Sequence, residues 1–151
     1  MIKKRRSMLK LCQSDYEEIR RHGEETYPHE CCGALLGKFQ DDARVVSATV
    51  RCYNTRTDSP GNRYEIDPGE VARIQRDARV RGLDVVGFYH SHPDHPANWS
   101  RTDLEDAYWL GCSYVITRVL NGKAEQTRSF VLSGSTVEEK AFAEEELAIE
   151  P

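Results

Sequence analysis

Three histidines lie close together in the middle of the sequence, at positions 90, 92 and 95. The first two belong to the run His90-Ser91-His92-Pro93, at the end of an apolar stretch that is typical of a buried strand. Because residues i and i+2 of a strand point to the same side, both imidazoles can point at one centre. Asp103 follows His92 by eleven residues, and two His with one carboxylate suit a catalytic Zn²⁺ with a fourth position open to water. The sequence therefore predicts a zinc site formed by His90, His92 and Asp103.

The same residues also permit a structural interpretation. Two His at a strand end can be held by hydrogen bonds alone, and Ser100-Arg101-Thr102-Asp103 is a capping box for a following helix. The two interpretations of Asp103 are compatible, because a helix N-terminus stabilises an ionised carboxylate. Hydrolysis by metal-activated water further needs a base beside the water, and Glu30 in a nearby apolar strand is the candidate.

Signatures of other enzyme classes are incomplete or absent. His29-Glu30 would begin the H-E-x-x-H motif of zincin proteases, but Gly33 stands where the second His is needed. The sequence contains no P-C-x-x-C of the zinc deaminases, no P-loop, no G-x-G-x-x-G and no G-x-S-x-G. These absences leave a metal-dependent hydrolase as the best-supported enzyme class.

The composition limits the class of protein. A chain of 151 residues with 38% hydrophobic and 30% charged residues fits one globular domain. No apolar run approaches the roughly 20 residues that a membrane span requires, and 25 acidic against 21 basic residues give no support for nucleic-acid binding. Five cysteines without C-x-x-C spacing indicate buried thiols in a reducing compartment. Because the basic N-terminus lacks the apolar segment of a secretory signal, we expect a cytoplasmic protein.

The pattern of elements predicts an α/β fold with a mixed sheet flanked by helices. We expect a basic N-terminal tail over residues 1–13, one domain over 14–135, and an acidic helix or tail over 136–151. The expected elements are a helix capped by Ser14 and ending near Pro28, strands over 30–39, 43–53, 64–66 and 83–90, helices over 68–81 and 100–110, and a hairpin of 112–120 and 123–132 around Asn121-Gly122. The polar stretch Asn54 to Arg63 is expected to be a loop that orders when substrate binds.

Together these residues resemble the JAMM motif of the MPN+ metalloprotease family. The motif is a Glu in an apolar strand, then H-S-H-P, six residues, Ser, two residues and Asp. Around it, HECCGALLG, RYEIDP and GFYHSHPDHPANWS are similar to the small prokaryotic branch of that family. The resemblance covers the chain from about Ser14 to Leu132 and implies a single-domain, deaminase-like MPN/JAB sandwich around a curved mixed β-sheet.

The resemblance also implies roles and substrates. His90, His92 and Asp103 would bind one Zn²⁺ per chain, Glu30 would be the base that activates water, and Ser100 would stabilise the oxyanion. The substrate would be a peptide or isopeptide bond at the C-terminus of a ubiquitin-like protein, for the small prokaryotic members a sulfur carrier, with cysteine or another adduct released in some cases. Two alternatives are a non-catalytic MPN scaffold that binds a ubiquitin-like partner and a metallopeptidase acting on short or cell-wall peptides. The resemblance assigns no oligomeric state.

Overall fold

The computed structural model describes residues 7–56 and 64–151 of the chain. Its elements, in chain order, are β1 (Met8–Cys12), α1 (Gln13–Thr26), β2 (Cys32–Gln40), β3 (Ala43–Cys52), α2 (Pro68–Val80), β4 (Asp84–Pro93), α3 (Arg101–Glu105), β5 (Ser113–Leu120), β6 (Lys123–Ser133) and β7 (Ala141–Glu150). Among the described residues, no helix is both long and apolar enough to cross a membrane.

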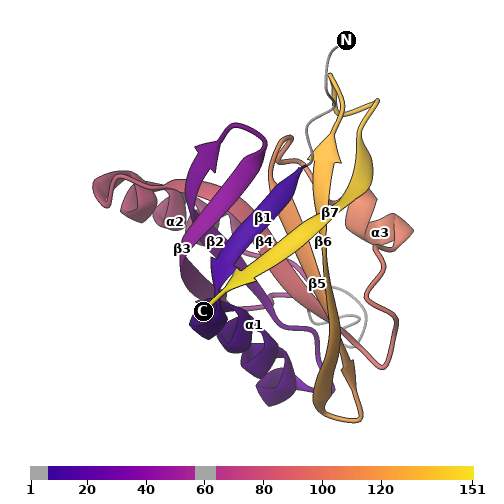
Figure 1. The fold of residues 1–151 in the computed structure, drawn as a ribbon. Helices are drawn as coiled ribbons and strands as arrows, with labels where there is room; N and C mark the ends of the chain where they lie inside the picture. The colour runs from indigo at the N-terminus through magenta and orange to yellow at the C-terminus, as the bar shows by residue number, and fades with distance from the viewer. Residues whose placement is uncertain (1–6, 57–63) are drawn as a thin grey trace.

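The described strands form one mixed sheet that curves back on itself (Figure 1). Their order is β1-β3-β2-β4-β5-β6-β7, and β7 pairs with β1, so the two ends of the sheet meet. The pairs β1/β3, β1/β7 and β4/β5 are parallel, and the remaining pairs are antiparallel. The predicted α/β class with a curved mixed sheet is confirmed.

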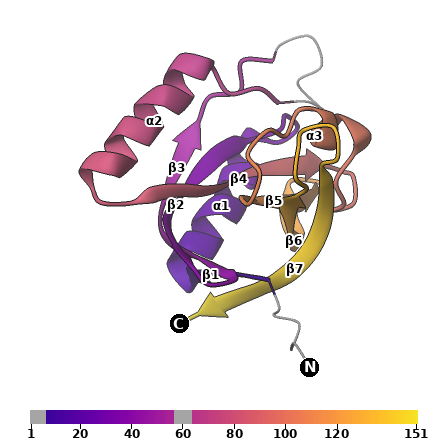
Figure 2. The same ribbon diagram turned by 90° about the horizontal axis from the view of Figure 1, so that it is seen from above.

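Helices cover both faces of this sheet. In Figure 2, α1 lies within the outline of the curved sheet and α2 lies outside it. Ile19 of α1 is buried with Leu9, Leu35 and Val86 from three different strands, because the inner face of a closed sheet needs an apolar plug. On the outer face, Ile74 of α2 is buried in a second cluster that includes residues of β2, β4, β5 and β6. Strand β4 is therefore buried on both faces, as its continuous apolar run predicts.

The two ends of the chain differ from the prediction. Residues 8–12 were expected in a basic tail but form β1, in which Leu9 and Leu11 are buried and alternate with half-buried neighbours. The C-terminal segment was expected to be a helix or tail, but residues 141–150 form β7. Glu and Ala favour helices in isolation, and here the pairing of β7 with β6 and β1 overrides that preference.

Some local signals are confirmed and others are wrong. Asp67 caps α2 through its side chain, and Asn121-Gly122 makes the β5–β6 turn with φ of 51° and 84°. The predicted Ser14 cap is wrong: α1 already begins at Gln13, directly after β1 ends, and no side chain of the described residues caps it through a hydrogen bond. The three-dimensional contacts of the preceding strand set the start of this helix.

The helix expected over 100–110 is shorter than predicted, and the strand expected over 64–66 is absent from the described structure. Helix α3 ends at Glu105, because the following Ala107 and Trp109 are drawn into the outer apolar cluster. Residues 64–66 form no strand within the described part of the chain; instead the Glu65 amide donates to the Asn54 side chain at 3.0 Å. The predicted ordering of the 54–63 loop falls mostly on residues outside the described ranges.

A buried ion pair joins the strands where the sheet closes. Glu145 of β7 accepts from the Arg44 guanidinium of β3 at 2.6 Å, and from the hydroxyls of Ser113 and Ser129 at 2.6 and 3.0 Å. Both charged side chains are almost fully buried. The pair therefore connects four strands across the inner part of the fold.

Glu145→Ala is expected to lower the free energy of unfolding by about 3–5 kcal/mol, because Arg44 would keep a buried charge without its partner. Urea unfolding of the metal-free protein, followed by circular dichroism, measures this change. Glu144→Ala is the matched control, since that neighbouring carboxylate is exposed and pairs with Arg128 at the surface; its loss should cost about 1 kcal/mol or less. Equal losses in the two variants would contradict the assignment.

Candidate metal centre

The C-terminal end of β4 presents two imidazoles to one point. His90 and His92 are 2% and 9% exposed, and their Nε2 atoms lie 3.2 Å apart. The strand continues to Pro93, three residues further than the sequence predicts, through parallel pairing with β5. This pairing holds His90 and His92 on the same side of an extended backbone.

Asp103 reaches the same point from the first turn of α3. Its Oδ1 lies 3.3 Å from His90 Nε2, and its Oδ2 lies 3.1 Å from His92 Nε2. The predicted capping box is present: the Asp103 amide donates to Ser100 Oγ at 3.1 Å, and the Ser100 amide donates to Asp103 Oδ2 at 2.8 Å. Asp103 therefore caps the helix and faces the two imidazoles at once.

The separations of these atoms fit a small tetrahedral cation. Zn²⁺ binds N and O ligands at about 2.0–2.1 Å, so ligands of one tetrahedral ion lie about 3.3 Å from each other. The two imidazole Nε2 atoms lie 3.2 Å apart, and each lies 3.1 to 3.3 Å from one oxygen of Asp103, Oδ1 for His90 and Oδ2 for His92. In addition, Glu30 offers a carboxylate oxygen within 4.8 Å of both imidazoles. The donor set can therefore hold a metal.

The pKa shifts of His90 and Asp103 suit a metal site, whereas the shift of His92 reflects its ion pair with Asp103. Burial lowers the pKa of His90, which favours the neutral imidazole that binds metals. For Asp103, burial alone would raise the pKa, but the neighbouring His90 and His92 outweigh it and hold the pKa well below its usual range. For His92, burial would lower the pKa, yet the Asp103 carboxylate raises it above the ordinary value.

Glu30 lies two residues before β2, against the histidines of β4. It is 2% exposed, and burial raises its pKa to about 8. One oxygen, Oε2, has no hydrogen-bond partner among the described residues. A buried carboxyl with a pKa near neutrality can take up and return a proton, so its environment suits a general base.

Ser91 forms hydrogen bonds with the residue that follows Glu30, a contact that the sequence analysis missed. The Cys31 amide, next to Glu30, donates to Ser91 Oγ at 2.9 Å, and the Ser91 amide donates to the Cys31 carbonyl at 3.2 Å. Ser91 therefore joins the strand of the ligands to the segment of Glu30. The sequence did contain a signal for this contact. Ser91 lies between two His that share one face of the strand, so the Ser91 side chain must point to the opposite face.

Two hollows meet at the centre. One, of about 370 Å³, is lined by Glu30 and His92 together with Trp99 and Ser100, and the loop residue His95 also lines it. Another, of about 390 Å³, also includes Glu30 and extends towards the end of α1. Glu30 therefore borders both hollows.

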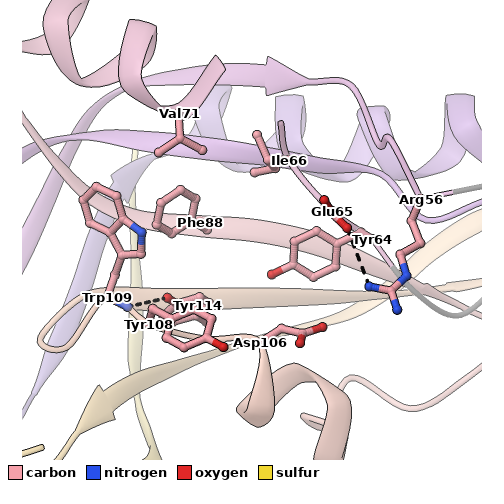
Figure 3. A pocket seen from close by; sticks show the side chains of 10 residues that line it. All are labelled: Arg56, Tyr64, Glu65, Ile66, Val71, Phe88, Asp106, Tyr108, Trp109 and Tyr114. Carbon is pink, nitrogen blue, oxygen red and sulfur yellow. Dashed lines mark hydrogen bonds and ion pairs between the residues drawn. The ribbon is translucent and has the colours of Figure 1, made fainter. Parts of the chain in front are cut away.

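Figure 3 shows a third hollow beside the centre, of about 270 Å³. Its aromatic lining consists of Tyr64, Phe88, Tyr108, Trp109 and Tyr114. The Tyr64 ring is also stacked on His90, with ring centroids 4.4 Å apart. Sequence reasoning missed this contact, which closes one side of the imidazole against water.

The chain matches a known family over most of its length. Residues 13–133 match the family described as prokaryotic homologs of the JAB domain. The chain belongs to this family. The resemblance to this family seen in the sequence is therefore confirmed.

Individual JAB-domain relatives agree with this assignment. The chain is 39% identical over 114 residues to the desampylase of Haloferax volcanii, covering 73% of this chain and 80% of that protein. It is 27% identical over 119 residues to the CysO-cysteine peptidase of Mycobacterium tuberculosis, covering 78% and 79%. The solution structure of protein DSY2949 from Desulfitobacterium hafniense superposes with a TM-score of 0.80 at 29% identity, covering 95% of this chain and 93% of that one.

Proposed function

We propose that this JAB-domain chain is a zinc-dependent peptidase that hydrolyses a peptide or isopeptide bond at the C-terminus of a ubiquitin-like sulfur-carrier protein. The observation that carries the proposal is the convergence of His90, His92 and Asp103 on one point with Glu30 beside it. The relatives named desampylase and CysO-cysteine peptidase support this class of substrate. The cytoplasmic location stays a prediction from the sequence.

His90, His92 and Asp103 would hold the ion. When bound, zinc supplies a Lewis acid that activates water and polarises the scissile carbonyl. Glu30 takes the proton from the attacking water and returns it to the leaving amine, so that the amine departs neutral. Because its carboxyl is buried, Glu30 gains from accepting a proton that would neutralise it.

Ser100 is the donor to the oxyanion in this proposal. Its Oγ accepts from the Asp103 amide at 3.1 Å, which leaves the hydroxyl hydrogen free to be donated. Ser100 also lines the hollow that contains Glu30 and His92. Its hydroxyl can therefore stabilise charge that develops on the carbonyl oxygen during attack.

Metal analysis combined with a cleavage assay tests the proposal. We expect about one zinc per chain, as the single ligand set requires, and release of a C-terminal extension from a sulfur-carrier protein of ubiquitin-like fold. A short peptide with the same cleavage site is the parallel substrate and should react more slowly. Equal rates on the two substrates would favour the short-peptide metallopeptidase, and a folded protein that takes up no zinc would favour the non-catalytic scaffold.

Ser100→Ala should retain zinc and lower kcat by about 10²-fold, because one donor to the oxyanion is lost. Loss of the cap should also cost about 1 kcal/mol of stability. Ser100→Thr, which keeps a hydroxyl for both roles, separates the two effects and should stay close to the wild-type protein. Full kcat in zinc-loaded Ser100→Ala would exclude Ser100 as the donor.

A further inference from the structure

Asp94, the residue after β4, connects three separate parts of the chain. Its Oδ2 accepts from the Tyr27 hydroxyl at 2.6 Å, and its Oδ1 accepts from the Asn121 amide at 2.9 Å. Its own amide donates to the Val119 carbonyl at 2.8 Å. The carboxylate of Asp94 thus joins the α1–β2 connection to the β5–β6 hairpin.

One of these bonds reaches the segment that carries Glu30. Tyr27 follows α1 directly and precedes Glu30 by three residues. The turn between them is tightened by the His29 amide, which donates to the Thr26 carbonyl at 2.9 Å. A displacement of Tyr27 would therefore be passed on to Glu30 through a short, hydrogen-bonded connection.

The other side of Asp94 leads to the ligands. Two residues further on, the Pro96 carbonyl accepts from His92 Nδ1 at 2.8 Å. This bond places the proton of the neutral ring on Nδ1 and leaves the Nε2 lone pair facing Asp103 and His90. The next residue, Ala97, is fully buried against Ile116. The loop that delivers the Pro96 carbonyl is therefore anchored by Asp94 at one end and by Ala97 at the other.

We propose that Asp94 is a positioning residue, which sets the placement of Glu30 relative to the ligand His92 by tying both segments to the β5–β6 hairpin. This inference rests on the proposed function and adds to it a residue outside the ligand set. The bond from Tyr27 holds the segment that carries Glu30, and the bonds to the hairpin hold the loop that contacts His92. Variants that remove one set of bonds at a time can separate the two effects.

Glycine at position 94 is the informative change. Asp94 has φ of 58°, a conformation that Gly adopts without strain, so Asp94→Gly removes the two acceptors alone. We expect zinc affinity, measured by competition with a chelator, to fall about tenfold, and kcat at saturating zinc to fall about tenfold with KM unchanged. Asp94→Asn keeps a side-chain acceptor and tolerates this φ. Its zinc affinity and its kcat should therefore lie within about threefold of the wild-type values.

Tyr27→Phe separates the two sides. It removes the bond to the Glu30 segment and leaves the bond from Asn121 in place. Its kcat should fall about tenfold while its zinc affinity stays at the wild-type value. Asp41→Gly is the matched control, because Asp41 also has a positive φ, of 53°, in the β2–β3 turn; it should change neither quantity.

Wild-type zinc affinity and wild-type kcat in Asp94→Gly would overturn the inference, as would equal losses in Asp41→Gly. Thermal unfolding of the metal-free variants shows whether Asp94→Gly has lost structure generally. If it has, the kcat and zinc affinity of Tyr27→Phe decide the test. A wild-type protein that binds zinc but cleaves no substrate would contradict the proposed function, while the zinc affinities would still decide the role of Asp94.

Discussion

Glu30→Gln is expected to lower kcat by about 10²–10⁴ while zinc stays bound at the wild-type stoichiometry. The amide has the shape of the carboxyl but cannot accept the proton of the attacking water. His90, His92 and Asp103, the proposed ligands, are unchanged in this variant. Zinc content and single-turnover cleavage, measured on the same preparation, give both quantities.

The control for this variant is Glu24→Gln. Glu24 is an exposed carboxylate near the end of α1 that accepts from the Ala124 amide at 2.9 Å, and an amide oxygen can accept the same bond. It should leave kcat unchanged. If zinc-loaded Glu30→Gln turns over at the wild-type rate, Glu30 is not the base, even though the chain belongs to the JAB-domain family.

Asp103→Ala is expected to abolish zinc binding and activity together. Asp103 contributes the only carboxylate that lies within 3.3 Å of both imidazoles among the described residues, and its loss leaves two of the three proposed ligands. Structural zinc sites with fewer ligands bind far more weakly, because the free energy of binding comes from the complete set. Metal content after dialysis at neutral pH, with the cleavage assay beside it, measures the result.

Two further variants protect this test against a general loss of structure. Asp103→Asn keeps a side-chain acceptor for the Ser100 amide, so it tests the charge with the cap in place. Glu105→Ala removes an exposed carboxylate from the same helix and should retain zinc and activity. Zinc at wild-type affinity in both Asp103 variants would exclude Asp103 as a ligand.

Short-range patterns were sufficient for several parts of the fold. The cap of α2 by Asp67 and the hairpin at Asn121-Gly122 follow from bonds and φ values within a few residues. The shared face of His90 and His92 follows from the period of an extended strand. The capping box that holds Asp103 also lies within four residues.

The edges of the sheet could not be predicted in the same way. The acidic run in β7 is typical of a helix or a tail. Glu145 nevertheless points inward, because it pairs with the buried guanidinium of Arg44, about a hundred residues earlier in the chain. In β1, the buried Leu9 and Leu11 alternate with Lys10, but five residues are too few for that alternation to stand out beside the basic residues before it.

The sequence by itself was enough to predict the α/β class and the family, and to propose the candidate ligands, because these depend on residue types and on spacings within one element or one loop. Only the tertiary structure decided that Glu30 lies beside His90, through the pairing of Cys32 with His90 across β2 and β4. The bond of Asp94 to Tyr27 and the stacking of Tyr64 on His90 have the same origin. Such contacts join residues tens of positions apart. Local sequence patterns allow many other pairings equally well, and only strand pairing and burial select the ones that form.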